Sequence, residues 1–311
     1  FILMILVSFF DWRVLKNRSF ILIFLYFIGI LALIGLFIFA PETRGTKGWY
    51  RIGGISADPI EFMKLILIIF VAKYFSDRHR EIHRFIHIVL SGTYFLIPAV
   101  LVFFQPNLGS ASVLIILWIA MLLVSGIRIK HFLLLLISGA LIFSLGWTLV
   151  LHDYQKDRIL SFIEPELDPL GIGWSQLQSK VAIGNGGMLG QGFGQGTQTQ
   201  YHFLSEPQTD FIFASIAEEF GFAGVLALFS LFIALLWRIF KAGIHAESNF
   251  PRLFATGFAA VIIAQFAVHV GMNLGLLPIV GLSLPFVSYG GSSLISQYII
   301  LGFLQSIRSH S

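Results

Sequence analysis

The sequence contains no cysteine and little charge. Its 311 residues include 20 Lys or Arg and 16 Asp or Glu, 12% of the chain, whereas soluble domains carry about 25%. Without cysteine, disulfides, thiolate metal sites and cysteine nucleophiles are excluded. The low charge excludes an ordinary cytosolic enzyme. Disordered chains are poor in aromatic residues, so the 33 Phe exclude that class too.

Apolar residues make up 57% of the chain, and the mean hydropathy is +0.86. Because a helix needs about 20 apolar residues to cross a bilayer, long stretches without formal charge locate membrane spans. We predict eight complete spans: 19–40, two within 85–127 divided at Gln105–Gly109, 131–152, 211–237 with Glu218 and Glu219 in its outer part, and two within 253–307 divided between Leu277 and Gly291. The eighth, about 59–75, is shorter and has Lys64 and Lys73 near its ends, where long side chains can snorkel. The predicted fold class is an all-α polytopic membrane protein, with residues 1–311 as a single integral membrane domain.

Residues 1–10 are apolar and begin abruptly. They have no initiator Met, no basic n-region and no small-residue cleavage site, so they do not match a signal peptide. We interpret them as the end of another transmembrane helix, in a chain that is truncated at its N-terminus. This partial helix would precede the eight complete spans.

The distribution of basic residues predicts the orientation. If loop 11–18 is cytoplasmic, so are 76–85, 127–130, 238–252 and the C-terminal tail, and with their flanks they hold 13 of the 20 Lys and Arg. Most acids and the largest loop, 153–209, fall on the other side. The sequence therefore predicts a membrane protein whose acid-rich face and largest loop lie outside the cytoplasm. Its net charge of +4 reflects cytoplasmic Lys and Arg and indicates no nucleic-acid partner.

The extracytoplasmic loop 153–209 is unusually long, and such loops are usually functional or disordered. Between 181 and 205 it is rich in Gly and Gln and has no formal charge. This segment is either a flexible surface loop or a segment on the membrane surface that cradles a polar ligand through backbone N–H groups. It matches neither the Walker loop nor the dinucleotide-binding fingerprint.

Asp210 stands where an apolar helix is predicted to begin. Two interpretations stay open: an N-terminal cap, since carboxylates favour that end of a helix, or a general base at the outer membrane surface. Glu61 and Lys64 lie one turn apart and share a helix face. They form either an interfacial ion pair or part of a functional site.

Three further polar residues lie within predicted spans. Glu218 and Glu219 are about two turns inside 211–237, where an acid needs a partner or a wet cavity, and a structural role is as reasonable as a catalytic one. His269 stands on an apolar helix, and we interpret it as hydrogen-bonded packing. No His or acid cluster has the spacing of a zinc site.

Ordered motifs along the whole chain resemble one known family. These motifs are His152–Gln155, Asp168–Gly171, Gln178–Gly184, Gly196–Gln200, Thr209–Ala214, Ala217–Glu219, Gly275–Pro278 and Leu284–Ser292. In order and spacing they resemble the SEDS proteins (shape, elongation, division and sporulation), the RodA and FtsW type. His152–Gln155 and Gly196–Gln200 are closer to the elongation member, RodA.

The resemblance implies a SEDS-type helical bundle of ten transmembrane helices, here without the first. It implies an inverting peptidoglycan glycosyltransferase that polymerises lipid II, an undecaprenyl-pyrophosphate-linked disaccharide-peptide, outside the cytoplasmic membrane. Asp210 matches the family's key acid and would be the catalytic base. The implied partner is a class B penicillin-binding protein, a transpeptidase, and the implied role is cell elongation and shape.

Ten residues are candidates for substrate binding. They are Trp49, Arg51, Glu61, Lys64, Gln178, Ser179, Lys180, Glu206, Ser288 and Tyr289. The three cations among them, Arg51, Lys64 and Lys180, could meet the negative charge of a leaving pyrophosphate. A divalent cation, Mg²⁺ or Mn²⁺, is a further candidate, and no metal site is assigned.

Four positions depart from the family's usual motifs. Gly48 replaces an Arg, Asp58 a Gln, Asn107 an Asp and Gln208 a His. The basic pocket is therefore expected to be thinner than usual, and Lys47 or Arg51 is a candidate substitute for the missing Arg.

Two other functions remain open. A transporter that flips lipid II or another polyprenyl-linked sugar could use Glu218 and Glu219, and a helix broken near Pro278 and Pro285. A non-catalytic scaffold would only bind a partner through apolar helix faces. Polymerisation that depends on Asp210 would separate the enzyme from both.

Overall fold

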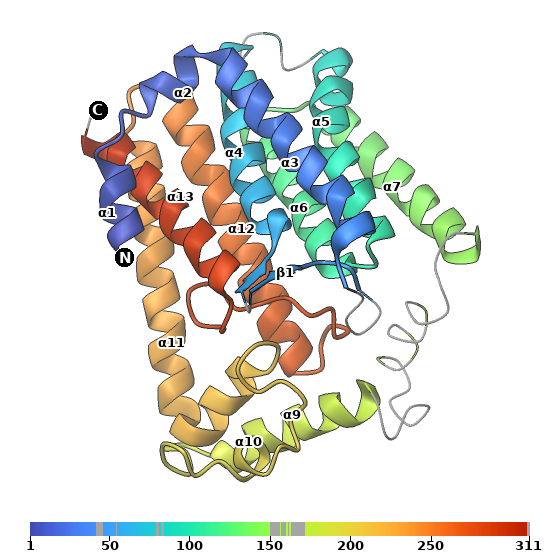
Figure 1. Cartoon of the computed structure of the whole chain (residues 1–311), viewed down its shortest axis with the longest axis vertical. Helices are drawn as coiled ribbons and strands as arrows, with labels where there is room; N and C mark the ends of the chain where they lie inside the picture. Colours follow the sequence, from blue (N-terminus) through green and yellow to red (C-terminus); the bar gives the residue numbers. More distant parts are fainter. Residues whose placement is uncertain are drawn as a thin grey trace. The chain divides into compact units, whose positions relative to one another are not determined.

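The computed structural model is mostly helical (Figure 1). It describes residues 1–41, 46–53, 55–78, 81, 84–149, 156, 160, 162 and 172–309. The helices are α1 Ile2–Ser8, α2 Arg13–Asn17, α3 Ser19–Phe39, α4 Pro59–Asp77, α5 Phe85–Phe104, α6 Leu108–Val124, α7 Ile129–Leu149, α9 Ile172–Gly186, α10 Thr197–Gln200, α11 Ile212–Ile244, α12 Asn249–Asn273 and α13 Gly291–Ser309.

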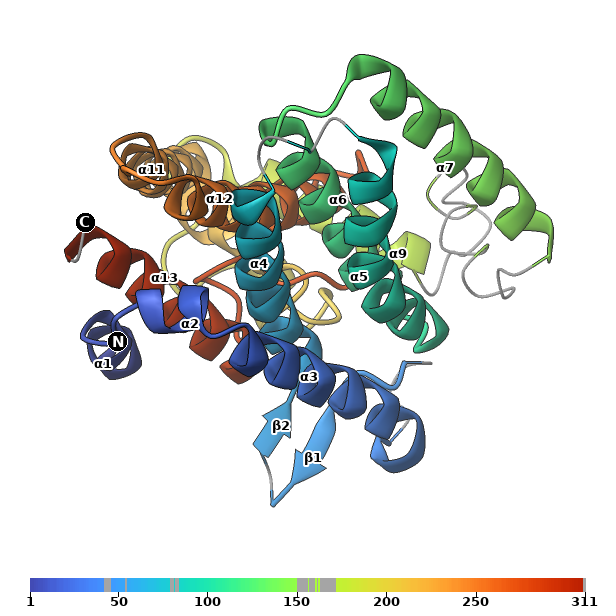
Figure 2. The ribbon, with the colours of Figure 1, turned by 90° about the horizontal axis from the view of Figure 1, so that it is seen from above.

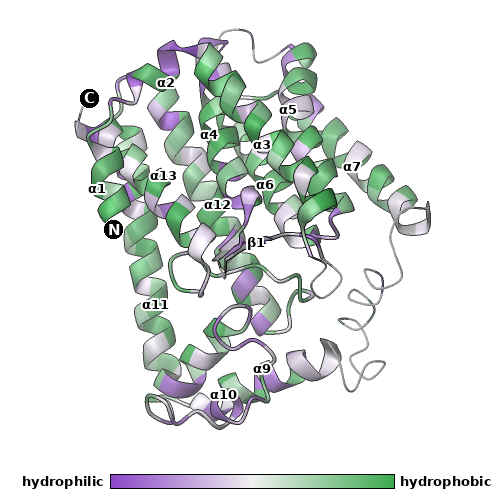
Figure 3. Ribbon diagram, in the orientation of Figure 1, coloured by the Kyte–Doolittle hydropathy of each residue, from purple (hydrophilic) through white to green (hydrophobic). Residues whose placement is uncertain are grey.

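Each of the eight predicted spans coincides with a helix, namely α3 to α7 and α11 to α13. Five of these helices (α3, α5, α7, α11 and α12) are long and apolar enough to cross a bilayer by length and composition. Figure 3 shows the apolar colouring along α3, α5 and α7. The chain is a multi-pass helical membrane protein, as predicted.

The chain forms two compact units. The first contains Phe1–His131, Leu236–Ala264 and Gly290–Ser311, and the second contains Phe132–Leu235 and Gln265–Tyr289. Helices α11 and α12 contribute residues to both. The assignment of residues 1–311 to one integral membrane domain stays a prediction.

In the first unit α4 packs against α3, α5, α6 and α13 (Figure 2). Ten residues of α4 are buried, including the polar pair Glu61 and Lys64. The predicted turn at Gln105–Gly109 separates α5 from α6. There the side chain of Asn107 accepts a hydrogen bond from Ser110 N at 3.1 Å. Asn107 thus caps α6, so this departure from the family motif keeps a good capping residue.

A short hairpin in the first unit was not predicted. Strands β1 Tyr50–Ile52 and β2 Ile55–Ala57 pair antiparallel, and Gly53 at the turn has φ of +58°, a conformation that glycine adopts without steric cost. Three-residue strands are too short to give a periodic signal. The hairpin leads straight into α4 (Figure 2).

The second unit contains α9, α10 and the first part of α11. Helix α11 is longer than its predicted span and bends at Gly221, whose φ and ψ of 65° and −162° are not helical. Within the predicted loop 153–209, residues 172–186 and 197–200 form helices. The motifs His152–Gln155 and Asp168–Gly171 lie outside the described residues.

Candidate functional site

Asp210 is held through its backbone by an asparagine at the end of α12. Asn273 is fully buried, and its Nδ2 donates to the carbonyl oxygen of Asp210 at 3.0 Å and to that of His269 at 2.8 Å. Its Oδ1 accepts from Ala214 N at 3.2 Å. One side chain thus ties Asp210, two residues before α11, and the first turn of α11 to the end of α12.

A second group of bonds holds the same segment from the loop before α13. Ser288 is buried; its hydroxyl donates to the carbonyl of Thr209 at 2.7 Å and accepts from Leu284 N at 2.8 Å. The backbone N–H of Tyr289 donates to the carbonyl of Gln208 at 2.9 Å. The three residues 208–210 are therefore fixed by partners far away in sequence.

The carboxylate of Asp210 faces the loop that follows α12. A Cβ placed on Gly281 would lie 3.8 Å from Asp210 Oδ2. Gly281 itself has φ of +67°. The absence of a side chain at Gly281 leaves space beside the carboxylate, and Asp210 is only half-buried. A polar ligand could approach the carboxylate from this side.

Lys180 contacts the same loop at Gly275. A Cβ on Gly275 would overlap the end of the Lys180 side chain, and Gly275 has φ of +71°. Lys180 is exposed at the surface of α9, and it forms no ion pair with the described residues. It is an available cation in the unit that contains Asp210.

The other candidates of this unit differ in exposure. Gln178 and Ser179 are buried, and the Ser179 hydroxyl donates to the carbonyl of Asn273 at 2.8 Å. Glu206 is half-buried and accepts from the Thr209 hydroxyl at 3.4 Å. The side chain of Tyr289 is 76% exposed. Their assignment to substrate binding stays a prediction.

The surroundings of Glu218 indicate a structural role. Its carboxylate is fully buried and accepts from Gln198 N at 2.8 Å, from Thr199 N at 3.1 Å and from the Thr199 hydroxyl at 2.9 Å. The Thr197 hydroxyl donates to it at 3.3 Å. These bonds hold the start of α10, because a carboxylate satisfies the free N–H groups at a helix N-terminus.

Glu61 and Lys64 form a buried ion pair in the first unit. Lys64 Nζ lies 2.6 Å from Glu61 Oε1, and the two side chains are 1% and 10% exposed. The hydroxyl of Ser296 in α13 donates to the carbonyl of Glu61 at 2.7 Å. The ion-pair interpretation of these two residues is confirmed, and their binding to substrate stays a prediction.

Asp58 begins α4. Its carboxylate accepts from Ile60 N at 2.9 Å, Pro59 follows as the first helical residue, and its own N–H donates to the Ser292 hydroxyl at 2.9 Å. Burial, and then the charge of Glu61, raise the pKa of Asp58 to about 7, against the smaller effects of Lys64 and the Ile60 N–H. Asp58 therefore places a third titratable group beside the ion pair.

Trp49 and Arg51 lie on the hairpin side of this unit. Trp49 directly precedes β1 and is half-buried. Arg51 lies in β1 opposite Ser56 and is exposed. It forms no ion pair with any residue that the structure describes. Both side chains are accessible to a ligand.

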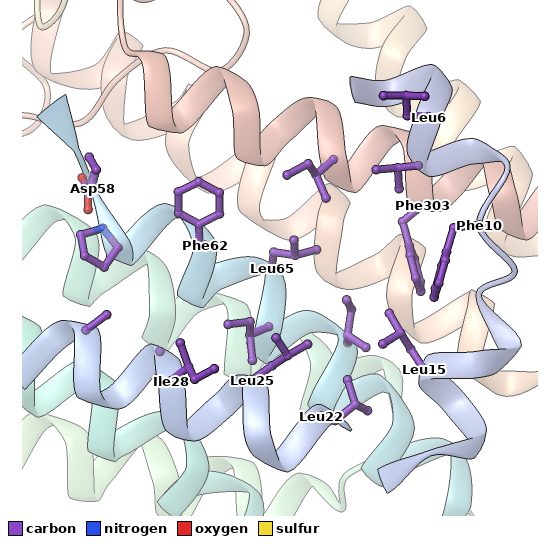
Figure 4. Close-up of a pocket in the computed structure, with 18 of the residues that line it drawn as sticks. Leu6, Phe10, Leu15, Leu22, Leu25, Ile28, Asp58, Phe62, Leu65 and Phe303 are labelled. Carbon is purple, nitrogen blue, oxygen red and sulfur yellow. The ribbon is translucent and has the colours of Figure 1, made fainter. Parts of the chain in front are cut away.

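An apolar cavity of about 750 Å³ lies within the first unit. Figure 4 shows Asp58 at one end, Leu6 and Phe303 at the other, and Phe62 and Leu25 between them. Among the described residues that line the cavity, Asp58 alone carries a charged side chain. The cavity can therefore accept an extended apolar group whose polar end lies near Asp58.

The residues of the described ranges offer no ready metal site. Within them, no three His, Asp or Glu side chains come together in a group that could hold a metal ion. The divalent cation stays a prediction.

Sequence reasoning identified Asp210 but not the residue that holds it. Asn273 follows His269 by one helical turn in an apolar helix, and two polar residues on one buried face would have been a usable signal. His269 itself is fully buried, and its Nδ1 lies 2.7 Å from the carbonyl of Leu282. The interpretation of His269 as hydrogen-bonded packing is confirmed.

Known proteins are similar to this chain in sequence. The family model of the FtsW, RodA and SpoVE cell cycle proteins matches residues 1–311. The peptidoglycan glycosyltransferase MrdB of Escherichia coli is 35% identical over 293 residues, which cover 92% of this chain and 77% of that protein. Stage V sporulation protein E of Bacillus subtilis is 36% identical over 307 residues, 98% of this chain and 82% of that protein.

A solved structure also matches. It is described as a peptidoglycan synthase complex that coordinates polymerization and crosslinking, and one of its chains is similar with a TM-score of 0.84 and 31% identity, over 99% of this chain and 86% of that chain. Sequence family, relatives and fold therefore agree with the resemblance found in the motifs. The chain belongs to the FtsW/RodA/SpoVE family.

Proposed function

We propose that this protein is a peptidoglycan glycosyltransferase that polymerises lipid II into glycan strands. The observation that carries the proposal is the carboxylate of Asp210, held by fixed backbone contacts beside open space at Gly281, in a chain that is 35% identical to a peptidoglycan glycosyltransferase. Catalysis of glycosyl transfer needs a base held in place within reach of a sugar hydroxyl. The arrangement around Asp210 meets that need.

In the proposed reaction, the 4-hydroxyl oxygen of one lipid-linked disaccharide attacks the anomeric carbon of another. Asp210 accepts the hydroxyl proton while the new C–O bond forms. The bond from the anomeric carbon to the pyrophosphate oxygen breaks, and undecaprenyl pyrophosphate leaves with the electron pair. A single displacement converts an α-linked donor into a β-linked product, which makes the enzyme inverting. Because pyrophosphate is a good leaving group, no second carboxylic acid is needed.

Cations must balance the charge on the departing pyrophosphate. The charge of Lys64 is already matched by Glu61 at 2.6 Å. Lys180 and Arg51 are exposed and form no ion pair with the described residues. We therefore assign the first role in phosphate binding to Lys180, which lies in the same unit as Asp210, and include Arg51 as a second candidate.

The apolar cavity supports a lipid-linked substrate. Its volume of about 750 Å³ and its lining by residues such as Leu25, Phe62 and Phe303 suit part of a polyprenyl chain, since binding sites for apolar groups are concave and mostly apolar.

Location and partner follow from the same proposal. In this proposal the protein lies in the bacterial cytoplasmic membrane with Asp210 and its loop on the outside, and the excess of Lys and Arg in the alternate loops supports that orientation. A class B penicillin-binding protein would cross-link the strands that this protein makes, in line with the synthase complex that the chain resembles. The role in elongation, as in RodA, is part of the proposal.

The test is glycan synthesis from labelled lipid II by the purified protein with a cognate class B penicillin-binding protein. A ladder of glycan strands would support the transferase. If labelled lipid II instead crossed the membrane of liposomes without polymer, the protein would be a transporter. If the protein neither polymerised nor moved lipid II, but still bound the penicillin-binding protein, it would be a scaffold.

A further inference from the structure

The Gly-rich loop between α9 and α10 displays large apolar side chains. Met188, Leu189 and Phe193 are 74%, 82% and 82% exposed. No residue from 181 to 205 has a formal charge. Clustered apolar side chains at a protein surface usually mark a contact with a partner or a membrane. The proposed chemistry gives these three residues no role.

Backbone hydrogen bonds fix this loop to the bend in α11. The N–H of Phe222 donates to the carbonyl of Gly187 at 2.9 Å, and the N–H of Ala223 donates to the carbonyl of Met188 at 3.1 Å. The non-helical conformation of Gly221 frees these N–H groups from the helix. The apolar loop residues therefore lie at the level of residues 221–223 and are held there rigidly.

The sequence of α11 indicates how deep residues 221–223 lie in a membrane. Residues 220–237 contain no Asp, Glu, Lys or Arg, with Glu219 before them and Arg238 after them. The helical residues after the bend, 222–237, rise about 24 Å, which approaches the hydrocarbon thickness of about 30 Å. The bend at Gly221 thus lies at the edge of the hydrocarbon core, and the neighbouring Phe222 is 57% exposed.

The loop and α10 together have one apolar and one polar side. The ring of Phe193 contacts that of Phe220, with centroids 6.0 Å apart, so the apolar side is continuous with the exposed surface of α11. On the polar side, the N–H groups of Gln198 and Thr199 point inward to the buried carboxylate of Glu218. This division resembles that of an interfacial amphipathic segment, whose apolar side enters the membrane.

We propose that loop 187–196 inserts Met188, Leu189 and Phe193 among the lipid chains of the leaflet around this end of α11. Lipid is the occupant that fits, because these side chains continue the apolar surface of a spanning helix at the edge of the hydrocarbon core. The insertion would hold the loop and α10 at the membrane surface, where a lipid-linked sugar has its headgroup. It does not depend on the proposed transferase activity.

The chain has no native cysteine, so one introduced cysteine can carry a nitroxide label. The variants are Leu189→Cys and Phe193→Cys in the full protein, in vesicles of phosphatidylethanolamine and phosphatidylglycerol. Power-saturation electron paramagnetic resonance compares collisions with oxygen, which concentrates in lipid, and with a water-soluble nickel chelate. Phe222→Cys is the lipid-facing control, and Gln200→Cys, exposed in α10, is the water-facing control.

We expect oxygen to dominate at positions 189 and 193, as at 222, and the nickel chelate to dominate at 200. The logarithm of the oxygen-to-nickel ratio would therefore change sign between position 193 in the loop and position 200 in α10. Relaxation of the labels at 189 and 193 by nickel, as at 200, would overturn the proposal. Shielding from both reagents would indicate contact with protein and would overturn it as well. Because all four positions are exposed, the substitutions do not disturb a core.

Discussion

The side-chain amide of Asn273 donates to the backbone oxygen of Asp210 at 3.0 Å while accepting from the N–H of Ala214 at 3.2 Å. Asn273 thus spans the point where α11 begins and fixes the residue that we assign as the base. An asparagine in this position acts through Asp210 and touches no substrate itself. It is a positioning residue, and its removal should affect both catalysis and folding.

Asn273→Leu should lower the rate of glycan synthesis and also destabilise the protein, because each buried polar group left without a partner costs about 1–3 kcal/mol. The matched control is Gln265→Leu. Gln265 is buried in the same helix, and its amide has no hydrogen-bond partner among the described residues, so this change should not lower the melting temperature in detergent. If both variants matched the wild type in rate and melting temperature, Asn273 would have no positioning role.

Lys64→Met should be strongly destabilising, because it leaves the Glu61 carboxylate buried without its partner at 2.6 Å. Loss of one partner from a buried pair costs about 3–5 kcal/mol. The control is Arg84→Met, which breaks an exposed i,i+3 pair with Glu81 at 3.7 Å and should cost less than about 1 kcal/mol. The free energy of unfolding of both variants can be measured in mixed detergent micelles. Equal effects from the two variants would contradict the account.

Asp58 should make stability depend on pH. Its folded pKa of about 7 lies above the ordinary value of 3.8, so between these values the folded chain binds more protons than the unfolded chain. Stability should then fall as the pH rises through this window. Asp58→Asn keeps a side-chain oxygen for capping α4 and should remove the contribution of Asp58 to this fall in stability with pH. Melting temperatures of the wild type and the variant, measured from pH 5 to 8, would show this difference in pH dependence. Identical pH dependence in the two proteins would refute a raised pKa for Asp58.

Glu218→Gln should loosen the start of α10. The new amide group would face the N–H groups of Gln198 and Thr199, which now donate to the carboxylate, and hydrogen bonds to charged groups contribute about 1.5–3 kcal/mol each. Amide hydrogen exchange at residues 198 and 199 should accelerate. Glu219→Gln is the control, because the Glu219 side chain makes no hydrogen bond with the described residues. Unchanged exchange in Glu218→Gln would show that the carboxylate does not hold the loop.

The helices were predictable from sequence because long uncharged stretches and breaks such as Gln105–Gly109 are local features. The bend at Gly221 and the hairpin around Gly53 were not, since a single glycine in an apolar or short segment gives no periodic signal. Asp210 was found through its motif and its place before an apolar helix. Asn273 was missed because its partners lie 59 and 63 residues away in the chain; its spacing of one turn from His269 indicates a buried polar face but does not identify those partners.

The most direct test of the account is glycan synthesis from labelled lipid II by the wild type and by Asp210→Asn, each with the cognate class B penicillin-binding protein. The amide keeps the size of the side chain and the backbone contacts of Asp210 with Asn273, but it cannot accept the proton. A positioned base contributes about 100- to 10,000-fold to the rate, so we predict a loss of at least about 100-fold, with an unchanged melting temperature. Equal polymer from the two proteins would contradict the central claim.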